Sequence, residues 1–185
     1  MKTMKLPHVI RKAAIAICYA AFISPALAQD KSDLTDEEVA SVAVVANQID
    51  IRAAELAKKQ SKNDKVLSFA GTMISDHQAV IDQASALVKK LGVTPKENAV
   101  GQGLLDNAAK VEERLKSLSG AAFDKAYVDN EVSYHEAVIG AIKDLLIPQA
   151  ENAELKELLT GVLPAFDAHL GHAKMLQKEL NGKQY

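Results

Sequence analysis

The chain has almost no cysteine and no tryptophan. Its single cysteine among 185 residues is Cys18, which lies in an apolar segment near the amino terminus. Residues 29–185 therefore cannot form a disulfide, a thiolate metal site or a cysteine-dependent active site. They also lack a glycine-rich phosphate loop and the alternating pattern of strands, and aromatic residues make up only 4% of the chain. These absences leave an all-α protein without nucleotide chemistry.

The first 28 residues have the composition of a secretory signal peptide. Four basic residues precede an apolar run that ends near Ile23, and Ala26-Leu27-Ala28 is a small-x-small cleavage pattern. The apolar run is shorter than the ~20 residues of a membrane span, and Cys18 lies inside it rather than at the cleavage point. We therefore expect cleavage after Ala28 and a periplasmic location without a lipid anchor, with association with the outer membrane as an open alternative.

Basic runs are also missing. Once the four basic residues of the leader are removed, 18 basic and 24 acidic residues remain, a net charge of −6. Such a chain offers no electrostatic footprint for nucleic acid, and no second apolar segment is long enough to span a membrane. The remaining length fits one domain, which we place at residues 35–180 between short tails at 29–34 and 181–185.

Helical periodicity dominates this domain. Apolar residues recur at alternating steps of three and four in four long segments: 35–59, 63–91, 121–147 and 152–180. Thr35 and Glu38 form a capping box at the first segment, and Gly92 is a helix stop after the second. Pro148 is expected to end the third helix, and Pro164 predicts a kink or a restart in the fourth.

The connection between the second and third long helices is long. Glycines and a proline mark residues 92–103 as a loop, and a weaker helical pattern covers 104–118. Four helices with one long crossover in the middle are typical of ferritin-like bundles. We therefore predict a ferritin-like four-helix bundle with a short extra helix in this connection. A simple up-and-down order with an inserted helix is the alternative.

Three histidines lie on the apolar stripes of three different predicted helices. His77, His135 and His169 each fall within about one turn (~5 Å) of their helix centres. Asp50 lies near the centre of the first predicted helix, on a face of small residues. Glu131 lies one turn before His135, on the same helix face. Titratable groups that face a core are costly unless they have partners. We therefore expect these five side chains to meet in the middle of the bundle.

Three imidazoles with one or two carboxylates suit one divalent transition metal ion, with zinc, copper, iron and manganese as candidates. The Glu-x-x-His motif of di-iron ferritin-like proteins is absent from the sequence, which favours a mononuclear site. The alternative is a metal-free network of hydrogen bonds that includes Tyr127, one turn before Glu131, or Tyr134. Asp76 is expected to face a neighbouring helix or solvent, and His172, which is off the stripe, to face mostly solvent.

Three stretches carry a family resemblance. LSFAGTMISDH, which ends at His77, resembles an FA-x-x-M-x-x-DH signature, and LSGAAFDKAYV, which begins at Leu118, resembles LSGAxFDxxYV. Leu163-Pro164 followed by His169 resembles LP-x4-H. Over residues 35–180 the chain is similar to the domain of unknown function 4142 family, whose members are often described as periplasmic or outer-membrane proteins. The family usually has glutamate at the position of Asp50. The resemblance implies a ferritin-like bundle and says little of activity.

Three functions are compatible with the sequence. The first is a periplasmic protein that handles or buffers a divalent transition metal, for example under envelope stress. The second is a structural or interaction protein of the cell envelope with a metal-free buried network and an unspecified protein partner. The third, a redox enzyme, needs an open coordination position and a substrate path, and the sequence shows neither. We assign no catalytic residue and expect binding rather than turnover.

Overall fold

The computed structural model describes residues 33–182, and no strand occurs among them. The helices are α1 (Asp36–Gln60), α2 (Asp64–Leu91), α3 (Ala99–Lys116), α4 (Gly120–Ala141), the π-helical segment η1 (Ile142–Leu146), α5 (Ile147–Gln149) and α6 (Ala153–Gly182). The all-α prediction is confirmed. The expected leader with its cleavage point after Ala28 lies outside the described residues, as do residues 183–185. None of the described helices is both long and apolar enough to cross a membrane.

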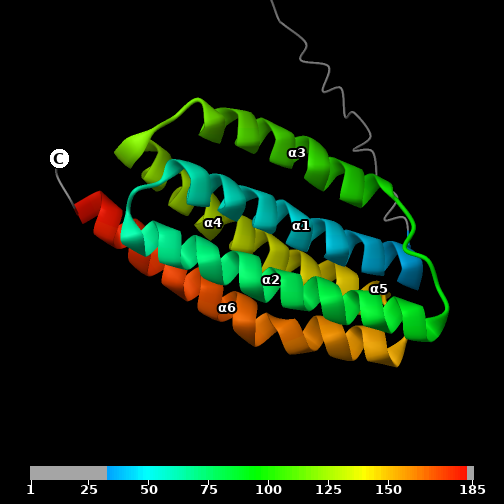
Figure 1. Cartoon of the computed structure of the whole chain (residues 1–185). Coiled ribbons are helices and arrows are strands. Elements are labelled where there is room, and N and C mark those ends of the chain that lie inside the picture. Colours follow the sequence, from blue (N-terminus) through cyan, green and yellow to red (C-terminus); the bar gives the residue numbers. More distant parts are fainter. Residues whose placement is uncertain (1–32, 183–185) are drawn as a thin grey trace, which may run out of the picture. The chain divides into compact units, whose positions relative to one another are not determined.

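Four long helices form the bundle, and α3 covers one side of it. α1 pairs with α2 and α4 pairs with α6, while α2 also packs against α6 and α1 against α4. Because α3 returns along the outside of α1, α4 begins at the end of the bundle where α2 begins (Figure 1). α2 and α4 therefore run in the same direction. This is the order of a ferritin-like bundle with one crossover, and not a simple up-and-down order.

Local signals fix the ends of the first two helices. The Thr35 side chain accepts a hydrogen bond from the Glu38 N–H (3.4 Å), and the Glu38 carboxylate accepts one from the Thr35 N–H (3.0 Å). A cap of this kind contributes about 1 kcal/mol. Gly92 ends α2 in the left-handed region, at φ 68°, where glycine has no steric penalty. These caps set the register of the two helices that carry Asp50 and His77.

α3 begins five residues earlier than predicted. Asn98 is the reason, because its side-chain oxygen accepts a hydrogen bond from the Gly101 N–H (2.9 Å) and its side-chain nitrogen donates to the Glu38 carbonyl of α1 (3.1 Å). The cap satisfies the free backbone donors of the first turn, and the two glycines at 101 and 103 lie inside the helix. The predicted loop is thereby shortened to residues 92–98.

Neither proline breaks a helix where the sequence predicts. The third long helix does not end before Pro148, because η1 widens the preceding turn and the Ile147 N–H bonds to the Ile142 carbonyl. A π-turn of this kind accommodates a residue that lacks a backbone donor. α6 continues through Pro164, which is exposed. Of the kink or restart expected at Pro164, the restart is therefore wrong, and His169 belongs to the same unbroken helix as Leu155.

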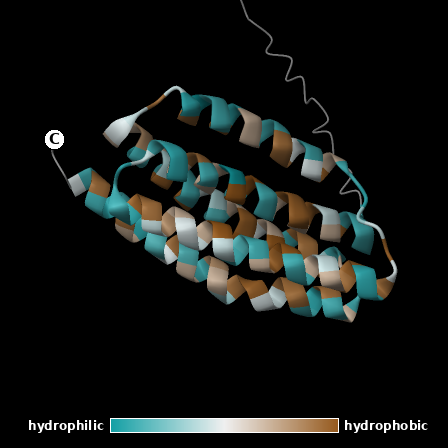
Figure 2. Ribbon diagram, in the orientation of Figure 1, coloured by the Kyte–Doolittle hydropathy of each residue, from teal (hydrophilic) through white to brown (hydrophobic). Residues whose placement is uncertain are grey.

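The core consists of two apolar clusters. One contains Val66, Phe69 and Leu176, and the other contains Val39, Leu155 and Phe166. Bands of hydrophobic and hydrophilic residues alternate along the helices (Figure 2), so that each helix turns one apolar face to the core. Between the two clusters lies a layer of buried polar side chains, which is the candidate site.

Candidate metal centre

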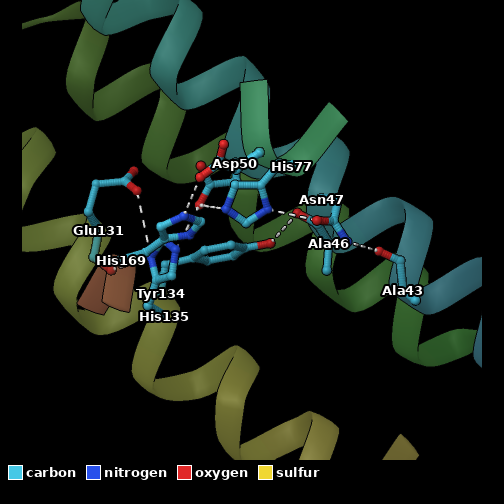
Figure 3. Close-up of polar contacts among 10 residues, drawn as sticks. Ala43, Ala46, Asn47, Asp50, His77, Glu131, Tyr134, His135 and His169 are labelled. Carbon is cyan, nitrogen blue, oxygen red and sulfur yellow. Dashed lines mark hydrogen bonds and ion pairs between the residues drawn. The ribbon is translucent and has the colours of Figure 1, made fainter. Parts of the chain in front are cut away.

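All five side chains selected from the sequence meet in this layer (Figure 3). Asp50 comes from α1, His77 from α2, Glu131 and His135 from α4, and His169 from α6. None exposes more than 6% of its surface, and Glu131 exposes 0%. The expectation that similar helices place their centres at one level is confirmed for these residues.

The three imidazole rings form a compact triangle. Their centroids are 5.6 Å apart for His77 and His135, 5.3 Å for His77 and His169, and 5.5 Å for His135 and His169. Phe166 packs against all three rings, with centroid distances of 4.9, 6.1 and 6.0 Å. This apolar lid on one side of the triangle limits the access of water to the ring nitrogens.

The protonation of His77 follows from its neighbours. Its Nδ1 lies 2.7 Å from the side-chain oxygen of Asn47, and the Asn47 amide nitrogen donates to the Ala43 carbonyl (2.8 Å). The Asn47 oxygen, oriented in this way, can only accept a hydrogen bond. The proton of His77 is therefore on Nδ1, and its Nε2 presents a lone pair. Nε2 is buried and has no hydrogen-bond partner.

His135 and His169 are also each oriented by a hydrogen bond to an acceptor outside the cluster of candidate ligand atoms. His135 donates from Nδ1 to the Glu131 carbonyl (2.9 Å), and His169 donates from Nε2 to the Asp76 carboxylate (2.9 Å). Each ring therefore presents one unprotonated nitrogen, His135 Nε2 and His169 Nδ1, and both are buried without a partner. Ring orientation by an outer acceptor is the usual arrangement around metal-binding histidines.

The carboxylates lie beside these nitrogens. Asp50 Oδ2 is 3.6 Å from His77 Nε2 and 3.8 Å from His135 Nε2. Two ligands bound at ~2.1 Å to a tetrahedral ion are about 3.4 Å apart, so these separations need little adjustment. One ligand atom from each of the three histidines lies within 4.8 Å of the others, and the same holds for Asp50, Glu131 and His135. No hydrogen bond of good geometry reaches the carboxylate oxygens of Asp50 and Glu131, while the two carboxyl groups lie close enough together to share a proton.

Burial favours the neutral forms of the titratable groups in the centre. Burial raises the pKa of Asp50 to about 7, and burial together with the Asp50 charge raises the pKa of Glu131 well above its usual range. Burial lowers the pKa of His77 to about 3 and of His135 to about 4. In the described part of the chain, no lysine or arginine forms an ion pair with either carboxylate. A divalent cation in the centre would supply the positive charge that these two carboxyl groups have no side-chain partner to provide, and it would favour their ionised form.

The sequence matches the family model of a domain of unknown function (DUF4142) over residues 22–176. The chain belongs to this family. The match includes all five residues of the centre. No curated protein and no solved structure matches the chain. The chemistry of the centre is therefore the main indication of what this DUF4142 protein does.

Sequence reasoning missed the outer partners. Asn47 lies three residues before Asp50 on α1, and that spacing puts both on one helix face, which is the one signal that could have identified it. Asp76 was expected to face a neighbouring helix or solvent, and it does face α6, where it holds His169. Tyr127 does not donate to Glu131, since its hydroxyl has no partner, and Tyr134 donates instead to the Ala46 carbonyl (2.8 Å).

His172 lies outside the centre. It is half-buried and packs against the ring of Phe69, with a centroid distance of 5.0 Å. The fourth histidine of the domain is therefore no ligand candidate. It is a useful control, because it lies one turn after His169 on the same helix.

The raised carboxyl pKa predicts alkaline destabilisation of the metal-free protein. Folded Glu131 keeps its proton at a pH where the unfolded chain has lost it, so the folded state binds more protons and the free energy of unfolding falls as pH rises. We expect a slope of up to about 1.4 kcal/mol per pH unit, from near neutral pH upwards until Glu131 ionises. The lowered histidine pKa values have the opposite sign and act only below pH ~6.5. Urea unfolding with a chelator present measures this slope.

Two substitutions test whether Glu131 is the origin of this pH dependence. Glu131→Gln is permanently neutral and should give a flat profile over the same pH range. Glu113→Gln, an exposed position on α3, should keep the slope of the wild type. A wild-type profile that is flat above pH 7 would contradict the assignment.

Proposed function

We propose that this protein binds one divalent transition metal ion through His77, His135, His169 and Asp50, with Glu131 as a further ligand or as the acceptor of a shared proton. The observation that carries the proposal is the set of three buried lone pairs, each on a ring oriented by an outer acceptor. Nitrogen and oxygen donors suit zinc, copper, iron or manganese.

The same geometry favours metal handling over catalysis. All proposed ligands are buried and come from four helices, which is typical of closed sites that hold a metal rather than present it to a substrate. We therefore propose a role in metal handling or buffering in the cell envelope, for example under stress. The periplasmic location rests on the leader expected from the sequence.

The second candidate is an envelope interaction protein whose centre is a metal-free network. The lowered pKa values of His77 and His135 and the raised pKa of Glu131 support it, because burial favours the neutral form of each of these groups. It predicts that each histidine-to-alanine substitution costs ~1–3 kcal/mol, as expected when a buried partner is left unsatisfied, whatever the supply of metal.

Metal content distinguishes the two. The protein expressed from the full chain is purified without an affinity tag and analysed for metals, beside the triple variant His77→Ala/His135→Ala/His169→Ala and the matched control His172→Ala. We expect about one equivalent of metal per chain in the wild type and the control, and background in the triple variant. Background in the wild type after loading with each candidate metal would leave the metal-free network as the function of the centre.

A further inference from the structure

A second feature is a cavity of about 320 Å³ beneath α3. α3 lies alongside α1 (Figure 1), and the cavity extends from α3 past α1 and α4 to residues of α2, η1 and α6. Its lining is mostly aliphatic, and a volume of this size is within the range of small-molecule pockets.

α3 forms one wall of the cavity. Gly101 and Leu115 are the buried residues of this helix. Between them Leu104, Ala108 and Val111 continue the apolar stripe, and they are only half-buried and line the cavity. Leu104 and Val111 also pack against the two apolar clusters of the core, so this cavity, called the channel from here on, adjoins the apolar interior of the bundle.

The volume of the channel limits its ligand. About 320 Å³ is at the lower end of the range for small-molecule pockets. This space suits one hydrocarbon chain better than a lipid with two chains.

The charged residues of the lining indicate the headgroup of the ligand. Arg52 and Glu112 are the two charged residues of the lining. Glu112 is paired with Lys116 at 2.5 Å. The hydrogen bond from Lys116 lowers the pKa of Glu112, and the charge of Arg52 contributes to this shift. Arg52 forms none of the direct ion pairs in the described part of the chain. Arg52 is exposed at the rim, and a guanidinium group is well suited to bind a carboxylate.

We propose that this channel binds a single-chain fatty acid, with the hydrocarbon chain beneath α3 and the carboxylate at Arg52. The proposal does not rest on metal binding. The two sites nevertheless share a wall, since Asn47 and Phe166 line the channel and also contact the histidines of the centre. The bound chain would therefore lie against the outer side of the residues that orient His77.

Laurate, used below its micellar concentration, tests the channel by calorimetric titration into the purified full-chain product. We expect saturable binding of one laurate per protein. Ala108→Phe fills the middle of the channel and should abolish binding, whereas its neighbour Ala109→Phe, which is exposed and does not line the channel, should bind as the wild type does. Ala137→Phe, at an exposed position of the lining on α4, is a second blocking variant that leaves α3 unchanged.

The headgroup contact has its own control. Arg52→Gln should weaken laurate binding about three- to fivefold, the effect of one exposed ion pair, and leave binding of neutral 1-dodecanol unchanged. Arg114→Gln, an exposed arginine outside the lining, should change neither. No saturable binding of laurate to the wild type would overturn the proposal, as would equal affinity in both blocking variants. Equal weakening of laurate and dodecanol by Arg52→Gln would overturn the assignment of the headgroup.

Discussion

Saturating the protein with zinc is expected to raise its free energy of unfolding by about 4 kcal/mol at a free zinc concentration a thousand times the dissociation constant. The proposed ligands come from α1, α2, α4 and α6 and are separated by up to 119 residues, from Asp50 to His169. They meet only in the folded state, so zinc binds the folded chain far better than the unfolded one. Urea unfolding with zinc and with a chelator measures the difference.

Matched variants locate the effect. His172→Ala should keep the full gain, since this ring packs against Phe69 outside the centre. The triple variant of His77, His135 and His169 should lose it. The same unfolding free energy for wild type with and without zinc would contradict the proposed site. A gain that survives in the triple variant would place the bound zinc elsewhere on the chain.

The sequence predicts the centre well because two simple periodicities coincide. The helical repeat places His77, His135 and His169 on core-facing stripes, and helices of similar length align their midpoints in a bundle. A residue near the middle of each helix therefore lies at the same level, whatever the details of packing. The same argument brings in Asp50, because the small residues beside it leave space for a buried carboxylate.

Features that depend on contacts between helices could not be predicted in this way. Whether Asn47 reaches His77, or Asp76 reaches His169, depends on the rotation of one helix against another, which the repeat fixes only coarsely. The early start of α3 depends on a hydrogen bond from Asn98 to the Glu38 carbonyl, 60 residues away in sequence. The channel beneath α3 likewise depends on residues from several helices, and the apolar stripe of α3 alone does not predict it.

The outer partners give the last prediction. Asn47→Ala is expected to weaken zinc binding about 10- to 100-fold. Asn47 is buried, and its oxygen is the acceptor that keeps the proton of His77 on Nδ1. Without it the ring can rotate or carry its proton on Nε2, and the lone pair no longer points steadily at the site. Competition with a chelator of known zinc affinity measures the change.

We expect the loss of zinc affinity on removing an outer partner to depend on how deeply that partner is buried, and Asp76 offers the comparison. The Asp76 side chain is 47% exposed, so water can replace its carboxylate, and Asp76→Ala should weaken zinc binding less than Asn47→Ala does. Asn47→Asp keeps an acceptor at the same place and should restore most of the affinity, as in carboxylate–histidine–zinc triads. Gln48→Ala, exposed and next in sequence on α1, should bind zinc as the wild type does. If Asn47→Ala also bound zinc with the affinity of the wild type, the Asn47 amide would not be what orients His77 as a ligand.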